Sequence, residues 1–198
     1  MTMWFYRFGQ FVCDTVFSLV FRLRTVGVDN IPKSGPVMLC SNHISNLDPP
    51  LIGTRVPRKL HFMAKAELFD IPLFASLIRV LGAFPVKRGG VSKESIRTAI
   101  QLLKDGNVIC IFPEGTRNNL EAVGKRGAAA IALKAGAVVI PVAIVGTYRP
   151  FRRMTIVYGK PLDLSDFDGS TSEQTELATE RIMNAIRTLL AEGPDKAK

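Results

Sequence analysis

The chain has 198 residues, of which 47% are hydrophobic and 22% charged. These values fit one globular domain with a real core and exclude wholesale disorder. The formal net charge of +9 favours an anionic partner, whether nucleic acid, an acidic membrane surface or a phosphorylated small molecule, without choosing among them.

The first segment is rich in aromatic side chains: seven of the sixteen aromatic residues lie in the opening two dozen positions. On a helical wheel the polar residues fall on one side and apolar residues cover the rest. The polar residues are Arg7, Asp14, Ser18 and Arg22. The apolar residues are Trp4, Phe8, Phe11, Val12, Val16, Leu19, Val20 and Leu23.

The apolar stretch is interrupted by Asp14 and falls short of the roughly 20 residues that a bilayer crossing needs. It also lacks the basic start and small-residue cleavage site of a secretory signal. We therefore predict that residues 1–27 form an interfacial amphipathic helix, with Arg22 and Arg24 near anionic lipid. A first helix packed on the protein's own core is the alternative interpretation.

A turn-rich stretch at 29–36 opens the main domain, predicted to span 28–192. The apolar run Val37 to Cys40 predicts a buried strand that delivers His43 just past its C-terminal end, where open α/β sheets bind ligands. Asp48 precedes Pro49 and Pro50, which predicts a helix with Asp48 as N-cap and Pro49 in its first turn.

Further strands and helices alternate along the chain. The expected strands lie at 60–63, 83–86, 108–112, 137–145 and 154–157, and Pro141 argues for an edge position or a bulge in the fourth of them. The expected helices lie at 72–80, 92–105, 125–133 and 171–190. This order predicts an α/β fold with a mixed, largely parallel twisted sheet flanked by helices. Residues 193–198 are expected to be a disordered tail.

His43 and Asp48 are the first candidates for chemistry. Their spacing of five would turn the side chains apart on one helix, but a loop that leads into a helix can bring them together. The carboxylate would then fix the imidazole tautomer, so that the free nitrogen accepts a proton as a general base. The alternative is a polar histidine satisfied at a helix N-terminus. The other histidine, His61, is interpreted as structural because it falls in a predicted strand.

A second polar block, Glu114 to Arg117, follows the strand at 108–112 and should reach the same sheet edge as His43. Gly115 permits a turn that other residues avoid, and Arg117 can grip a phosphate with two nitrogens. Arg88 also ends a strand, beside two glycines. Further basic residues that would extend this lining are Lys65, Lys87, Lys125 and Arg126. An ordinary strand-ending turn with a surface arginine is the alternative.

Other site classes lack a signal in the sequence. No P-loop, dinucleotide fingerprint or metal-ligand cluster is present. The cysteines Cys13, Cys40 and Cys110 are widely spaced without a Cys-x-x-Cys pair, and are interpreted as reduced core residues of a cytosolic protein. The aromatic residues do not alternate with basic residues on strands, so nucleic acid is not expected as a partner.

At these residues the chain resembles the lysophosphatidic acid acyltransferase (1-acyl-glycerol-3-phosphate acyltransferase) family. Four family blocks can be matched in order. They are Asn42 to Asp48, Gly82 to Arg88, Phe112 to Arg117, and Ile140 to Ile144. The resemblance implies the glycerol-3-phosphate acyltransferase-like fold and direct transfer of an acyl group from coenzyme A or acyl carrier protein to lysophosphatidic acid, giving phosphatidic acid for phospholipid biosynthesis.

The resemblance also assigns roles to residues. His43 would act as the base and Asp48 would orient it. The phosphate of the acceptor would be held by Arg88 and Arg117, with Glu114 and Gly115 shaping the turn. Thr116 and Lys65 are expected to belong to the same phosphate site. No metal or cofactor is implied. The enzyme would work at the cytoplasmic face of the cell membrane as a peripheral or monotopic protein on an anionic surface.

Two alternatives stay open within this resemblance. The acceptor can be another lysolipid or an aminolipid, and the chain can be a catalytically silent protein that only binds lipid surfaces. The family pattern is also not matched everywhere: Asn118 stands where serine commonly follows the arginine, and Gly124 where many members carry a bulky residue.

Overall fold

The computed structural model describes residues 2–86, 93–113 and 127–193. The described strands form one sheet in the order β1-β7-β6-β2-β5-β3-β4. The strands are β1 (Arg24–Val26), β2 (Val37–Ser41), β3 (Leu60–Lys65), β4 (Ala83–Val86), β5 (Val108–Ile111), β6 (Val138–Val145) and β7 (Thr155–Tyr158). All neighbouring pairs are parallel except β6 and β7, which are antiparallel. The predicted mixed, largely parallel sheet is confirmed.

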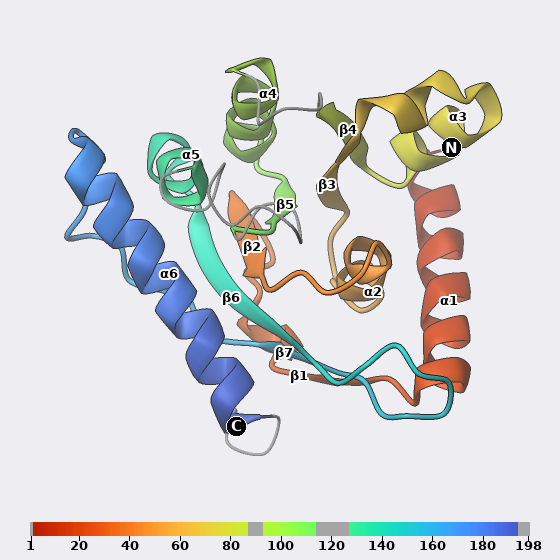
Figure 1. The fold of residues 1–198 in the computed structure, drawn as a ribbon. Coiled ribbons are helices and arrows are strands. Elements are labelled where there is room, and N and C mark those ends of the chain that lie inside the picture. The colour runs from red at the N-terminus through yellow and green to blue at the C-terminus, as the bar shows by residue number, and fades with distance from the viewer. Residues whose placement is uncertain (1, 87–92, 114–126, 194–198) are drawn as a thin grey trace.

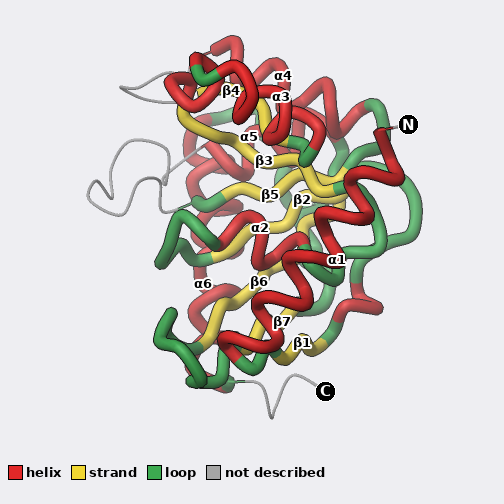
Figure 2. Tube along the Cα trace, turned by 90° about the vertical axis from the view of Figure 1, so that its right-hand side faces the viewer, coloured by secondary structure: helices red, strands yellow, loops and turns green. Residues whose placement is uncertain are grey.

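Helices cover both faces of this sheet (Figure 1). The α-helices are α1 (Thr2–Phe21), α2 (Asp48–Gly53), α3 (Pro72–Val80), α4 (Lys93–Lys104), α5 (Gly127–Ala135) and α6 (Ser172–Glu192), and short 3-10 helices lie at η1 (Val28–Asn30) and η2 (Ala66–Asp70). α1 and α2 lie on one side of the sheet, and α4, α5 and α6 lie on the other. Seen from the side, α1 crosses the front of the sheet (Figure 2).

The side chains along each strand point alternately to the two faces of the sheet, and this produces two separate hydrophobic cores. Val37 and Leu39 of β2 face the core under α1 and α2, whereas Met38 and Cys40 face the core under α4, α5 and α6. Successive side chains of a strand point to opposite faces, so a run of apolar residues serves both layers. This explains why β2, which lies between β6 and β5, is buried along its whole length.

The expectation for Pro141 was wrong. β6 lies inside the sheet, between β2 and β7, and Pro141 pairs with Cys40 without a bulge on that side. The proline is tolerated because it lies opposite Gly159, just past the end of β7, where its carbonyl accepts the Gly159 N–H at 2.8 Å. A Cβ on Gly159 would come within 2.8 Å of the Pro141 ring, so a glycine at that position makes room for the ring.

The predicted N-terminal helix is present but shorter than the expected 1–27: α1 ends at Phe21, and Arg24–Val26 form β1, which pairs with β7. The polar stripe of the helix points toward the protein. Arg7 donates to the Pro57 carbonyl at 2.7 Å, and Asp14 forms an ion pair with Arg55 at 2.8 Å. The helix ends where Arg22 takes a left-handed conformation, with φ of 48°. Among the described residues no helix is long and apolar enough to span a membrane.

The apolar side of α1 is divided between the core and the surface. Tyr6, Phe17 and Phe21 are buried. Trp4, Phe11 and Leu19 are each about 70% exposed, at 73%, 68% and 71%. The helix therefore packs on the domain and at the same time leaves a row of large apolar side chains uncovered.

The C-terminal helix follows its prediction closely. α6 begins after Thr171, whose side-chain oxygen accepts the Gln174 N–H at 3.2 Å, as expected of an N-cap. Ala178, Ile182 and Ile186 pack against the sheet. The expected cap at Ser92, the helix start at 125–126 and the tail after Gly193 lie outside the described residues.

Candidate active site

His43 and Asp48 are in contact, as predicted. The loop that leaves β2 turns back on itself, closed by a hydrogen bond from the Asp48 N–H to the Ser45 carbonyl at 3.1 Å. This turn brings His43 Nδ1 to 2.7 Å from Asp48 Oδ2. The imidazole therefore lies at the C-terminal edge of the sheet with a carboxylate bonded to one nitrogen.

Asp48 does not cap its helix in the expected way. Leu47 occupies the N-cap position, and Asp48 is the first helical residue. Its carboxylate reaches backwards along the chain: Oδ2 accepts the N–H groups of Ile44 and Ser45 at 2.6 and 2.8 Å. The physical reason is that the Ile44 and Ser45 amides of the preceding turn need an acceptor, and the Asp48 carboxylate folds back to provide it.

The buried Asp48 carboxylate is held in its ionised form by four donors. Besides His43 and the two amides, the Tyr148 hydroxyl donates to Oδ1 at 2.7 Å. Burial raises the pKa of Asp48, but hydrogen bonds from His43, Ser45, Tyr148 and Ile44 outweigh it, so that the net pKa lies below its ordinary value. An ionised carboxylate only accepts, so Nδ1 of His43 is the donor in this contact, and the tautomer that it favours is the one with the free lone pair on Nε2.

Asn42 anchors the turn to the neighbouring strand. Its side-chain amide donates to the Ile144 carbonyl at 3.1 Å, and its carbonyl oxygen accepts the Ile144 N–H at 2.8 Å. The side chain thus continues the β2–β6 ladder after the backbone has turned away. The sequence interpretation assigned no role to Asn42; an amide side chain directly after a buried strand was the available signal.

Phe112 links the second motif to His43. Its ring stacks on the imidazole, with ring centroids 4.1 Å apart and planes at 22°. Pro113, which follows it, is buried. The described part of the chain therefore passes directly beside the histidine at Phe112. The sequence interpretation placed Phe112 at the end of a strand and at the start of a family block, but it did not foresee this contact.

The predicted phosphate-binding residues fall largely beyond the described part of the chain. Arg88, Glu114, Gly115, Thr116 and Arg117 lie outside it, as do Lys87, Lys125 and Arg126. Lys65 is described: it is exposed at the end of β3, on the same edge of the sheet as His43, with β5 between β3 and β2.

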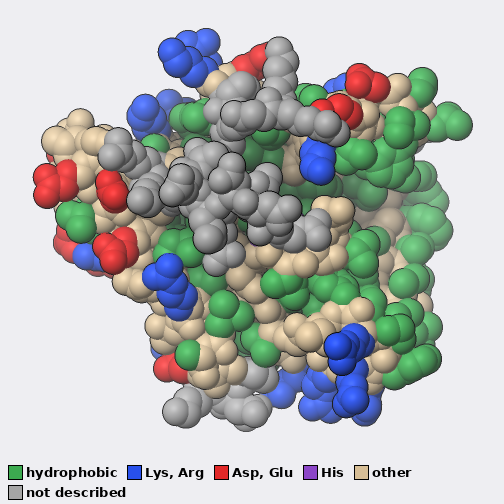
Figure 3. Space-filling view, viewed as in Figure 1, with side chains coloured by type: hydrophobic (Ala, Val, Ile, Leu, Met, Phe, Trp, Pro, Cys, Tyr) green, Lys and Arg blue, Asp and Glu red, His purple; other side chains and the backbone are tan. Residues whose placement is uncertain are grey.

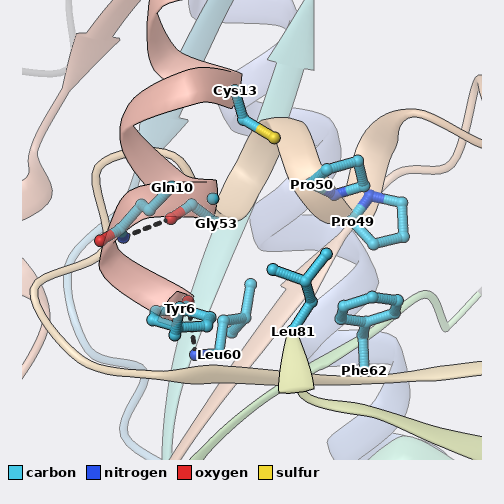
Figure 4. A pocket seen from close by; sticks show the side chains of 10 residues that line it. Tyr6, Gln10, Cys13, Pro49, Pro50, Gly53, Leu60, Phe62 and Leu81 are labelled. Atoms are coloured by element: carbon cyan, nitrogen blue, oxygen red, sulfur yellow. Dashed lines mark hydrogen bonds between the residues drawn. The ribbon is translucent and has the colours of Figure 1, made fainter. Parts of the chain in front are cut away.

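A small apolar cavity lies behind the turn, between α1, α2 and β3 (Figure 4). Its volume is about 50 Å³, and Pro49 and Pro50, which follow Asp48, form part of its wall. Gln10 and Cys13 of α1 line the opposite side. The lining carries no charged group, so the cavity suits hydrocarbon better than phosphate.

The remaining polar candidates have ordinary surroundings. His61 lies in β3, where burial and then the charge of Lys59 lower its pKa. Cys40 and Cys110 are buried free thiols, and burial raises the pKa of both. Within 2–86, 93–113 and 127–193, no group of three or more His, Cys, Asp or Glu side chains is placed to hold a metal ion.

Comparison with known proteins gives consistent matches. The family model described as Acyltransferase matches residues 22–145. The 1-acyl-sn-glycerol-3-phosphate acyltransferase of Bacillus subtilis is 31% identical over 191 residues, which cover 93% of this chain and 96% of that protein.

Two further matches extend this result. A solved 1-acyl-sn-glycerophosphate (LPA) acyltransferase, PlsC, from Thermotoga maritima superposes with a TM-score of 0.70 at 30% identity, covering 100% of this chain and 81% of that one. The lyso-ornithine lipid O-acyltransferase of Pseudomonas aeruginosa is 38% identical over 133 residues, which cover 64% of this chain and 48% of that protein.

Proposed function

The chain belongs to the Acyltransferase family, and on that premise we propose that it moves a fatty acyl group from a thioester donor to the free hydroxyl of lysophosphatidic acid, giving phosphatidic acid. The resemblance inferred from the sequence motifs is confirmed at the level of the family. The donor is coenzyme A or acyl carrier protein. The observation that carries the proposal is the 2.7 Å contact between His43 and Asp48 at the edge of the sheet.

The proposed chemistry uses the free nitrogen of His43. Nε2 takes the proton of the acceptor hydroxyl as its oxygen forms a bond to the thioester carbonyl carbon. The carbon–sulfur bond then breaks, and the leaving thiolate takes the proton back from the imidazolium. Asp48 stabilises the positive charge on His43 between these steps. General-base catalysis of this kind contributes roughly 10²–10⁴-fold in rate.

The acceptor is proposed to be an amphiphile. Ile44 and Leu47, which lie between His43 and Asp48 in the chain, are large apolar residues with exposed side chains. Such residues beside a base favour a substrate with a hydrocarbon tail over a small polar one. We assign its phosphate to Arg88, Glu114, Gly115, Thr116, Arg117 and Lys65 on the family resemblance. The described residue of the same family block, Phe112, supports the assignment because its ring stacks on the base His43.

The enzyme is proposed to dock on an anionic membrane surface through α1 and α3. Apolar side chains gather along the edge of the molecule formed by these two helices (Figure 3). On α1 the residues Trp4, Phe11 and Leu19 are largely exposed, and on α3 Leu73 is 89% exposed. An apolar area of this extent on a soluble surface typically marks an interaction site.

Arginines surround the C-terminal end of α1 and support the same orientation. Arg22 and Arg24 follow the helix directly, and the exposed Arg149, Arg152 and Arg153 lie in the segment between β6 and β7. That segment touches the helix end, since the Phe151 N–H donates to the Val20 carbonyl at 2.6 Å. Basic residues near an anionic leaflet contribute about 1 kcal/mol each. We propose the cytoplasmic face of the cell membrane as the site of action.

A second candidate acceptor is a lyso-ornithine lipid, because the name of one relative points to it. The protein with 38% identity carries the name lyso-ornithine lipid O-acyltransferase, and an ornithine lipid has no phosphate. If this chain acts on such an aminolipid, Arg88 and Arg117 would have a different partner.

The deciding experiment incubates the purified protein with lysophosphatidic acid or lyso-ornithine lipid, each with acyl-coenzyme A or acyl carrier protein thioester, and measures the products by mass spectrometry. We expect phosphatidic acid from the wild type and none from His43→Ala. Product from lyso-ornithine lipid alone would replace the first acceptor by the second. Equal rates with His43→Ala, or binding to liposomes without turnover of any acceptor, would contradict the enzymatic proposal.

A further inference from the structure

The Asp48 carboxylate has a partner that is remote in the sequence. His43 and the two amides of the turn all bond to Oδ2, whereas Oδ1 accepts the hydroxyl of Tyr148 at 2.7 Å. Tyr148 lies 100 positions away, in the segment between β6 and β7. Burial, and then the hydrogen bond and charge of Asp48, raise the pKa of Tyr148. The phenol therefore stays protonated and acts as a donor.

The position of Tyr148 depends in turn on α1. Its ring meets the ring of Phe21, the last residue of α1, edge to face with centroids 5.4 Å apart and planes at 88°. The backbone that follows Tyr148 in the chain also bonds to the end of α1, because the Met154 N–H donates to the Phe21 carbonyl at 2.9 Å. An aromatic pair in this geometry has a preferred orientation, so the end of α1 fixes where the phenol lies.

We propose that Tyr148 is a positioning residue for the His43–Asp48 pair and that it couples the placement of α1 to the orientation of the Asp48 carboxylate. The proposal rests on the proposed function. Without the phenol, Oδ1 is a buried acceptor that has lost its donor. We expect the carboxylate to rotate toward another donor, which would weaken its hydrogen bond with Nδ1 of His43. A base that is misplaced by about 1 Å can lose up to about 100-fold in rate while the substrates still bind.

A matched pair of tyrosine variants tests this role. Tyr148→Phe removes the hydrogen bond to Asp48 and keeps the ring. Tyr158→Phe is the control, because Tyr158 lies in the same core and donates at 2.6 Å to the Ile52 carbonyl instead of a carboxylate. We expect Tyr148→Phe to lower kcat by about 10- to 100-fold with KM for both substrates nearly unchanged. Tyr158→Phe should lower the melting temperature without that loss in kcat.

A measurement that is independent of turnover separates this proposal from the proposed function. The chain has two histidines, so ¹⁵N labelling of histidine yields two sets of ring signals, which His61→Gln assigns. We expect Tyr148→Phe to move the ring nitrogen signals of His43 toward a mixture of tautomers and to leave those of His61 in place. His43 signals identical to the wild type, together with an unchanged kcat, would overturn the positioning role.

The link to α1 has its own variant. Phe21→Leu keeps an apolar side chain at the helix end but removes the aromatic contact with Tyr148. We expect the His43 signals to move in the same direction as in Tyr148→Phe, by a smaller amount, with a smaller loss in kcat. If Tyr148→Phe moves these signals and Phe21→Leu does not, the coupling to α1 is wrong and only the positioning role of Tyr148 stands.

Discussion

The two faces of the sheet are covered in different ways. On the face of α4, α5 and α6, helices bury an apolar stripe against the sheet and turn charged residues outward, as α6 does with Glu173, Glu180 and Arg187. On the face of α1 and α2 the pattern differs. Polar residues of α1 bond to the domain, and its apolar side chains are divided between the core and the surface, where Trp4, Phe11 and Leu19 are exposed.

The catalytic candidates belong to the face of α1 and α2. Asp48 begins α2, and Tyr148, its remote donor, packs on the end of α1. The face that would meet lipid is thus the face that supports the His43–Asp48 pair, whereas the other face supplies a scaffold that is adapted to water.

The largest effect is expected from the carboxylate on the α1–α2 face. Asp48→Asn should reduce acyl transfer by about 10²–10⁴-fold, because the amide cannot hold His43 in the tautomer that leaves Nε2 free. Asp163→Asn, at an exposed aspartate before α6, is the matched control and should keep the wild-type rate. Steady-state kinetics checks both, and a similar rate for the two variants would remove Asp48 from the mechanism.

A smaller effect is expected on membrane binding. Leu19→Glu on the outer side of α1 should weaken binding to vesicles of anionic phospholipid by about 10- to 100-fold, since burying a leucine contributes about 1.5–3 kcal/mol. Leu177→Glu on α6 makes the same change at a side chain that is 48% exposed on the opposite face. Co-sedimentation measures both. Equal loss from the two variants would show that charge alone, and not the α1 surface, governs binding.

Stability should also differ between the faces. Gln10 of α1 donates to the Gly53 and Val56 carbonyls at the end of α2, at 2.7 and 2.8 Å. Gln10→Ala leaves both carbonyls without this donor and should cost about 1–2 kcal/mol in the free energy of unfolding. Gln101→Ala on α4 removes an exposed hydrogen bond to Asp105 and should cost almost nothing. Urea denaturation of the two variants provides the test.

The smallest effect is expected in the pH dependence of stability. Because the pKa of Asp48 in the folded protein lies below its ordinary value of 3.8, its ionised form stabilises the fold above that pH. This contribution is lost as the pH falls through the folded pKa. The free energy of unfolding should therefore decline below about pH 4, and less steeply in Asp48→Asn. If the free energy of unfolding of Asp48→Asn falls as steeply below about pH 4 as that of the wild type, the four donors do not lower the pKa of Asp48.

Much of the fold could be predicted because local patterns specify it. The continuous apolar runs at Val37 to Cys40 and Val108 to Ile111 identify buried strands, and Thr171 with the periodic Ala178, Ile182 and Ile186 identifies α6. Pro141 misled the prediction, because a missing N–H matters only where a partner strand needs it. The end of β7 removes that need.

The candidate site also has features that could be predicted from the sequence and contacts that only the tertiary structure decided. The sequence by itself determined that a histidine and an aspartate lie at a sheet edge. The reason is that Asn42 to Asp48 directly follow a buried strand and lead into a helix whose first turn holds two prolines. It also determined the composition of α1. Tertiary structure alone decided which side of α1 meets the domain, that Phe112 stacks on His43, and that Tyr148 reaches Asp48. These contacts join segments tens of residues apart, and local propensity carries no information about which distant side chain satisfies a buried donor or acceptor.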